Sequence, residues 1–241
     1  QLGEYSVSRN LSYSALNQLA AIVNQVSVPA FAAKTDAASQ IRALVFVVSL
    51  ASAVLFPLFW IMGIVSQIAL PLVLGGRWGH LVVPFIAFTA ILPLRGVNAL
   101  LYSSIIGTGR TATVFKNTLG FAVIIIPSMA IGVIKGADGV ALSWIFALPI
   151  IFFLGVHRIA KDLATGINIL LRPMAIPAFC AGMSAAAAEA ILLGLTHHIA
   201  PAIIVVLQCF VAPLCYWALF RSFARDQYDQ VLTTARRIIR G

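Results

Sequence analysis

The sequence has few charged residues. Lys, Arg, Asp and Glu make up 10% of its 241 residues, whereas soluble domains contain about 25%. So few charges cannot cover a water-exposed surface, which excludes an ordinary soluble domain. Hydrophobic residues make up 61% of the chain and the mean hydropathy is +1.00, so lipid must be the solvent for much of the surface. We therefore predict an all-α integral membrane protein, since helices satisfy their own backbone groups in lipid.

Cysteine is also scarce, and the chemistry of most enzymes is missing. The three cysteines lie inside apolar stretches without a CxxC motif, which excludes a disulfide framework. No HExxH motif, paired carboxylates or nucleophile–base pattern is present. His197 and His198 have no third ligand nearby and are interpreted as solvated loop residues. We expect no enzyme, no bound metal and no cofactor.

Seven stretches have the roughly 20 mostly apolar residues that a membrane span requires. The stretch 66–75 is too short to cross, and we expect a re-entrant or interfacial turn with Trp78 at the lipid headgroups. Residues 1–5 resemble the interior of a protein, so we expect the chain to be part of a longer one. The predicted spans are 11–33, 43–64, 80–107, 113–134, 138–156, 174–195 and 199–220.

The loops carry an asymmetric positive charge. Twelve Lys and Arg residues fall in one set of loops and the tail, and three fall in the opposite loops. Basic loops stay in the cytoplasm, which predicts an outside N-terminal end and a cytoplasmic C-terminus. The basic residues, which give a net charge of +9, are therefore topology signals rather than a nucleic-acid patch. The twelve are Lys34, Arg42, Arg110, Lys116, Arg158, Lys161, Arg172, Arg221, Arg225, Arg236, Arg237 and Arg240, and the three are Arg9, Arg77 and Lys135.

These features divide the chain into a transmembrane bundle, 1–221, and a basic cytoplasmic tail, 222–241. The tail alternates apolar residues with arginines. This pattern is typical of an amphipathic helix on the anionic inner leaflet, and a frayed basic end is the alternative.

The first predicted span carries a polar stripe. Asn10, Asn17 and Asn24 recur every seven residues, and such positions share one helix face. One interpretation is hydrogen bonding between helices, and the other is the wall of a water-filled cavity. The length of the stripe favours the cavity.

A single arginine, Arg95, lies within the third predicted span, near the middle of the bilayer. Inserting an unpaired arginine there costs at least about 2.5–3.5 kcal/mol, and this span contains no carboxylate. Asn98 and Tyr102 share its helix face. Arg95 either caps carbonyls freed by Pro93 or pairs with a segment outside this chain, or it provides a positive charge in a cavity. If Arg95 provides a positive charge in a cavity, a phosphate suits its guanidinium fork.

Two other features have competing interpretations. Apart from Asp138 at the first residue of the span 138–156, Glu189 is the only carboxylate inside a predicted span, and it takes part in ion coupling or lies at the interface. The sequence GTGR at 107–110 is similar to a phosphate-binding loop but lacks the spacing, the lysine and the preceding strand. A helix end is the favoured interpretation.

The order of these motifs resembles a known family. GEYS at 3–6 precedes a polar helix that ends in VPAF at 28–31. LPLVLGGRW at 70–78, GTGR at 107–110 and DGVALSW at 138–144 follow. The chain resembles the C-terminal half of a polysaccharide or lipopolysaccharide O-antigen flippase, a Wzx-type exporter of the multidrug/oligosaccharidyl-lipid/polysaccharide (MOP) superfamily.

This resemblance implies a MATE-like fold of two helical bundles around a central cavity, of which this chain supplies one. It implies translocation of an undecaprenyl-diphosphate-linked oligosaccharide across the bacterial inner membrane, with a polysaccharide polymerase and glycosyltransferases as partners. The family's FP-(L/F)-S element appears here as PAFA at 29–32, which leaves its role open. The expected cavity residues are Arg95, Asn98, Tyr102, Asn10, Asn17 and Asn24.

Two alternatives remain. A drug or cation antiporter of the same fold would favour carboxylates in the cavity, and the predicted spans offer none at mid-depth. A non-transporting scaffold in a glycan assembly complex would need no polar cavity.

Overall fold

The computed structural model describes residues 6–14, 16–17, 37–107, 109–195, 200–225 and 227–229. Within these ranges the chain is helical apart from short connections, and it contains no strand. Asn24, the PAFA segment, His197, His198 and the last twelve residues of the tail lie outside the described residues.

Six of the described helices are long and apolar enough to cross a membrane. This confirms the prediction of an all-α, multi-pass membrane protein. Of the first predicted span, 11–33, the described residues 11–14 and 16–17 are helical, as are residues 6–10 before it. The six helices are α2 (Ala37–Leu74), α3 (Val82–Gly107), α4 (Thr111–Gly132), α5 (Gly136–Asp162), α6 (Ile167–Leu195) and α7 (Pro201–Phe223).

The expected turn at 66–75 is wrong. Helix α2 runs without a break through this stretch to Leu74, with Pro71 inside the helix. Ser66 and Leu70 are buried against neighbouring helices, whereas Leu72, Val73 and Leu74 at the end of the helix are exposed. The turn comes later, at Gly75 with φ of 91° and in the 3₁₀ helix η1 (Gly76–Leu81), which contains Trp78.

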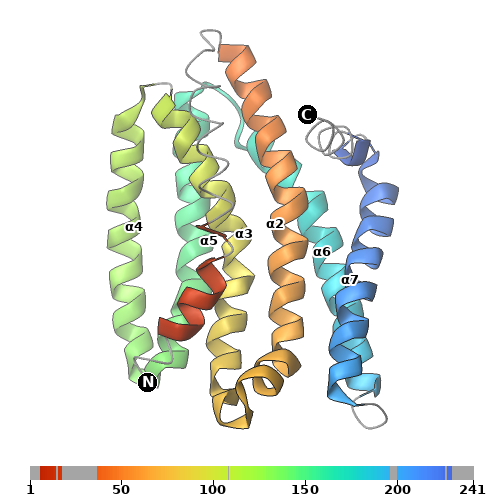
Figure 1. The fold of residues 1–241 in the computed structure, drawn as a ribbon. Coiled ribbons are helices and arrows are strands. Elements are labelled where there is room, and N and C mark those ends of the chain that lie inside the picture. The colour runs from red at the N-terminus through yellow and green to blue at the C-terminus, as the bar shows by residue number, and fades with distance from the viewer. Residues whose placement is uncertain are drawn as a thin grey trace.

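The helices form an up-and-down bundle (Figure 1). Helix α2 packs against α3, α6 and α7, α3 packs against α5, and α4 packs mainly against α5. Successive helices alternate in direction, so the α3–α4 and α5–α6 connections and the C-terminal end lie at one end of the bundle in Figure 1. The charge asymmetry predicts that this end faces the cytoplasm.

Specific contacts fix the helices around the site. The Trp60 indole Nε1 donates to the carbonyl oxygen of Ala90 at 3.0 Å, which joins α2 to α3. The buried Tyr216 hydroxyl donates to the carbonyl oxygen of Ala53 at 2.8 Å, which joins α7 to α2. Helices α4 and α5 approach closely at Gly132 and Gly139, where an added Cβ would lie 2.6 or 2.2 Å from the opposing carbonyl oxygen.

The GTGR sequence is a helix end, as favoured. Helix α3 ends at Gly107, and Gly109 has φ of 77°, a left-handed conformation that glycine adopts readily at helix ends. The backbone N–H groups of Gly109 and Arg110 donate to the carbonyl oxygens of Ile106 and Ile105. The arrangement reverses the chain into α4.

Candidate functional site

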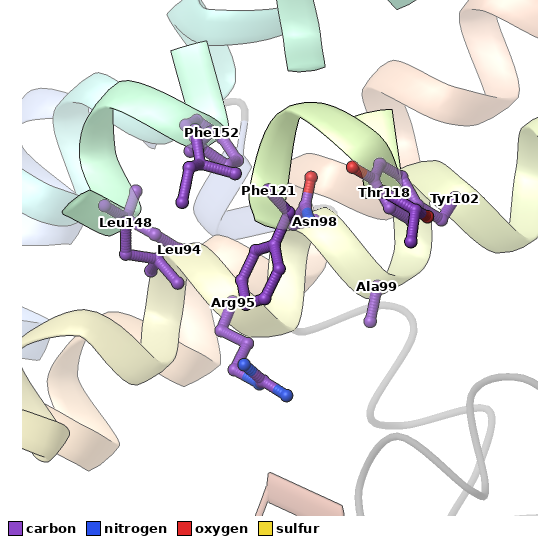
Figure 2. Close-up of a pocket in the computed structure, with 10 residues that line it drawn as sticks. Leu94, Arg95, Asn98, Ala99, Tyr102, Thr118, Phe121, Leu148 and Phe152 are labelled. Carbon is purple, nitrogen blue, oxygen red and sulfur yellow. The ribbon is translucent and has the colours of Figure 1, made fainter. Parts of the chain in front are cut away.

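A pocket of about 280 Å³ lies between α3, α4 and α5, and it contains three of the predicted cavity residues. Figure 2 shows Arg95 at one side of the pocket, with Asn98 between it and the pair Tyr102 and Thr118. The walls are otherwise mostly apolar. The lining residues are Leu94, Arg95, Asn98, Ala99, Tyr102, Thr118, Phe121, Leu148, Ile151 and Phe152.

Arg95 lies halfway along α3 and is partly buried. Its Cζ atom lies 4.9 Å from the ring centroid of Tyr13 and 5.9 Å from that of Trp144. Both rings attract a guanidinium through their negative faces. Figure 2 shows the Arg95 side chain extending away from Asn98 and Tyr102, so the rings hold the charge at the edge of the pocket.

Within the described part of the chain, Arg95 forms no ion pair. Ring contacts contribute about 0.5–2 kcal/mol each, and they leave the positive charge of the guanidinium uncompensated. Arginine remains charged in proteins and binds carboxylate or phosphate through two parallel hydrogen bonds. The pocket therefore presents a fixed positive charge that an anionic group would neutralise.

The other end of the pocket is polar. The Tyr102 hydroxyl lies beside the side-chain amides of Asn98 on α3 and Asn117 on α4. Among the described residues, the Oδ1 atom of Asn98 and the Nδ2 atom of Asn117 are buried without a hydrogen-bond partner. Buried polar groups are normally paired, so these two atoms are available to a bound molecule.

A second arginine stands next to this polar end. The Arg158 Nη1 atom on α5 donates to the carbonyl oxygen of Lys116 at 2.8 Å and to Oδ1 of Asn117 at 3.2 Å. The sequence analysis treated Arg158 as a loop charge and did not select Asn117. The available signal was Asn117 itself, an amide four residues after the start of the predicted span 113–134 and four residues before the aromatic Phe121 that lines the pocket.

Asn10 and Asn17 of the asparagine stripe do not line this pocket. Asn10 and Asn17 are exposed, whereas Ser8, Ser12, Tyr13 and Leu16 are buried on the packed side of the N-terminal helical segment. Ser8 donates to the carbonyl oxygen of Leu81 at 3.3 Å. The segment thus contributes Tyr13 to the site. This residue was not predicted, because the asparagine pattern selected the amides of the segment and not its aromatic ring. That Asn10, Asn17 and Asn24 face water stays a prediction.

Glu189 pairs with an amide from another helix. The Gln67 Nε2 atom on α2 donates to Oε2 of Glu189 on α6 at 2.8 Å. In the described ranges, no group of three His, Cys, Asp or Glu residues is placed to hold a metal ion. The Glu189 contact joins two helices and lies outside the Arg95 pocket.

One comparison with known proteins relates the chain to a function. Residues 1–84 match a family described as "Polysaccharide biosynthesis protein". No curated protein and no solved structure matches the chain. The match and the apolar helices together support a polysaccharide-related, multi-pass membrane protein.

Proposed function

We propose that the chain forms part of a flippase that moves an undecaprenyl-diphosphate-linked oligosaccharide across the bacterial inner membrane. The protein is then a transporter rather than an enzyme, with its C-terminus in the cytoplasm. A polysaccharide polymerase and glycosyltransferases would deliver or receive its substrate. The MOP superfamily and its O-antigen exporters are the relatives that this function implies.

One observation carries the proposal: Arg95 lies at mid-helix, beside a pocket, with ring contacts and no ion pair among the described residues. A charge in such a position is costly and marks a substrate pathway more often than a structural contact. The family match supplies the class of substrate, a precursor of polysaccharide. A lipid-linked precursor carries the diphosphate that Arg95 would bind during crossing.

The test is polysaccharide export in a null strain complemented with Arg95 variants. Arg95→Ala is expected to lose most export because the positive charge is gone. Arg95→Lys is expected to retain part, because it keeps the charge and loses the bidentate fork. Arg172→Ala is the matched control, since Arg172 is exposed at the start of α6 and outside the pocket.

Protein levels in the membrane must be measured beside export. Both Arg95 variants are expected to insert normally, since removing a mid-membrane charge makes insertion easier. Normal export by Arg95→Ala would contradict the proposal and favour the scaffold. Loss of the protein itself in both variants would assign Arg95 a structural role.

A further inference from the structure

We infer that Tyr102, Asn117 and Arg158 form a second anion-binding site, called here the α4 site, at the end of the pocket remote from Arg95. This inference rests on the proposed function, because it names where the anionic group of the substrate binds at another stage of its crossing. The bound group is a phosphate or a carboxylate, attached to a lipid or free.

Asn117 is the first argument for the α4 site. Its side chain is 3% exposed, and its Oδ1 atom accepts a hydrogen bond from Arg158. Its Nδ2 atom has no partner among the described residues, although a buried, unpaired donor is costly. The amide lies beside the hydroxyl of Tyr102, which lines the pocket. The Asn117 amide therefore adjoins the pocket through Tyr102.

Arg158 is the second argument. The partners of its Nη1 atom, the carbonyl of Lys116 and the amide of Asn117, are both uncharged. Asp162 follows one turn later, but its carboxylate accepts from Thr113 and its carbonyl oxygen accepts from Arg110. In the described part of the chain, Arg158 thus has hydrogen-bond partners and no counter-ion. Its guanidinium still has N–H groups to donate.

Glycines keep the α4 site open. A Cβ atom at Gly155 would lie 3.6 Å from Nδ2 of Asn117 and 3.7 Å from the Tyr102 hydroxyl oxygen. A Cβ atom at Gly120 would lie 3.0 Å from Nη1 of Arg158, which is tighter than normal contact. A side chain at Gly120 would therefore crowd the guanidinium of Arg158, whereas one at Gly155 would contact Asn117 and Tyr102 at ordinary distances.

The site has more donors than acceptors, which selects its ligand. The Asn117 amide N–H lies beside the Tyr102 hydroxyl, and the Arg158 guanidinium is hydrogen-bonded to the same amide, so a ligand must supply acceptor oxygens, and the positive charge favours an anion. Tyr102 follows Arg95 by seven residues, about 10 Å along the helix axis. Arg95 and Tyr102 therefore line one pocket about two helical turns apart, Asn117 and Arg158 adjoin it through Tyr102, and the two sites bind one anionic head group in succession.

Binding of a defined probe tests the inference. The purified protein in phosphatidylcholine nanodiscs is titrated with farnesyl diphosphate, and its melting temperature is measured in parallel. The decisive variant is Asn117→Asp, which places a carboxylate against Arg158. If Arg158 only fastens α4 to α5, the new ion pair keeps or raises the melting temperature and leaves binding unchanged. If the α4 site binds an anion, the carboxylate occupies the guanidinium and repels the probe.

We expect Asn117→Asp to weaken probe binding roughly tenfold or more, as for loss of a charge-assisted hydrogen bond, with no loss of melting temperature. Arg158→Gln keeps a donor for the Lys116 carbonyl without the charge, and it is expected to weaken binding similarly. Arg172→Ala is expected to bind as the wild type does.

Five further results separate the possible conclusions. Wild-type affinity in both α4-site variants, with weakened binding in Arg95→Ala, would overturn the α4 site and leave the proposed function standing. No binding to the wild type would overturn both. Inorganic pyrophosphate that binds as well as the probe supports a site for a free anion, and competition by phosphatidylglycerol in the nanodisc supports a phospholipid headgroup. Binding that requires the prenyl diphosphate supports the lipid-linked substrate.

Discussion

The guanidinium of Arg95 lies over the ring of Tyr13, with Cζ 4.9 Å from the ring centroid, and so joins α3 to the N-terminal helical segment. The same ring lies 5.1 Å from Cζ of Arg9 and packs edge-on against Phe88 at 5.9 Å. Tyr13 is 6% exposed. A buried ring held by Phe88 thus sets the position of the charge beside the pocket.

We predict that Tyr13→Leu reduces export severalfold, while Tyr13→Phe retains most of it. Leucine removes the ring that attracts Arg95, a contact of about 0.5–2 kcal/mol, whereas phenylalanine keeps the ring. Export in the complemented null strain measures the difference, with membrane protein levels as the control. Equal export by the leucine and phenylalanine variants would show that the ring does not position Arg95.

Most of the membrane-spanning helices could be predicted from the sequence, because an apolar stretch of sufficient length in lipid has few alternatives to the helix. The failure at 66–75 has a physical cause. The short length of the apolar stretch suggested a turn, but burial of Ser66 and Leu70 against other helices favours a continuous helix. Local signals of a turn do not reveal which tertiary contacts override them.

The site was predictable only along one helix. Arg95, Asn98 and Tyr102 were found because they share a face of α3, and the structure places all three at one pocket. Tyr13 and Arg158 come from segments far away in the sequence. Spacing within a helix gives no information on which residues of other helices complete the pocket, so these partners required the structure.

The two ends of α5 are expected to lie on opposite sides of the membrane. The helix has 27 residues, about 40 Å at 1.5 Å per residue, and the exposed Lys135 and Lys161 lie at its two ends. In a background without Cys180, Cys209 and Cys215, we expect a membrane-impermeant maleimide applied to intact cells to label Lys135→Cys and not Lys161→Cys. Permeabilised cells should label both, and labelling of both from one side would contradict the topology.

The contact between α4 and α5 depends on Gly139. A Cβ atom there would lie 2.2 Å from the carbonyl oxygen of Gly132, so Gly139→Ala must push the helices apart. We expect a loss of about 1–3 kcal/mol of stability, as for overpacking, measured by thermal unfolding in detergent. Gly166→Ala is the control, because nothing lies within 4 Å of its added Cβ. Equal melting temperatures of the two variants would contradict the close approach.

Variants of the hydrogen bond between Gln67 and Glu189 distinguish a structural role from a coupling role for the carboxylate in α6. Glu189 accepts from Nε2 of Gln67 at 2.8 Å, so the contact needs an acceptor at position 189 but not a charge. We predict that Glu189→Gln keeps both stability and export, because the glutamine Oε1 atom still accepts. Glu189→Leu is expected to lower stability by about 0.6–2 kcal/mol, the range for such contacts in membranes.

A double-mutant cycle with Gln67→Leu separates this contact from other effects of the substitution. If the two residues stabilise the bundle through their hydrogen bond, the double variant is less destabilised than the sum of the single variants. Stability comes from thermal unfolding, and export is measured in the same variants. A Glu189→Gln protein that folds normally but no longer exports would overturn the structural role. The charge itself would then be required, as in an ion-coupled antiporter that binds a proton or a cation at this carboxylate.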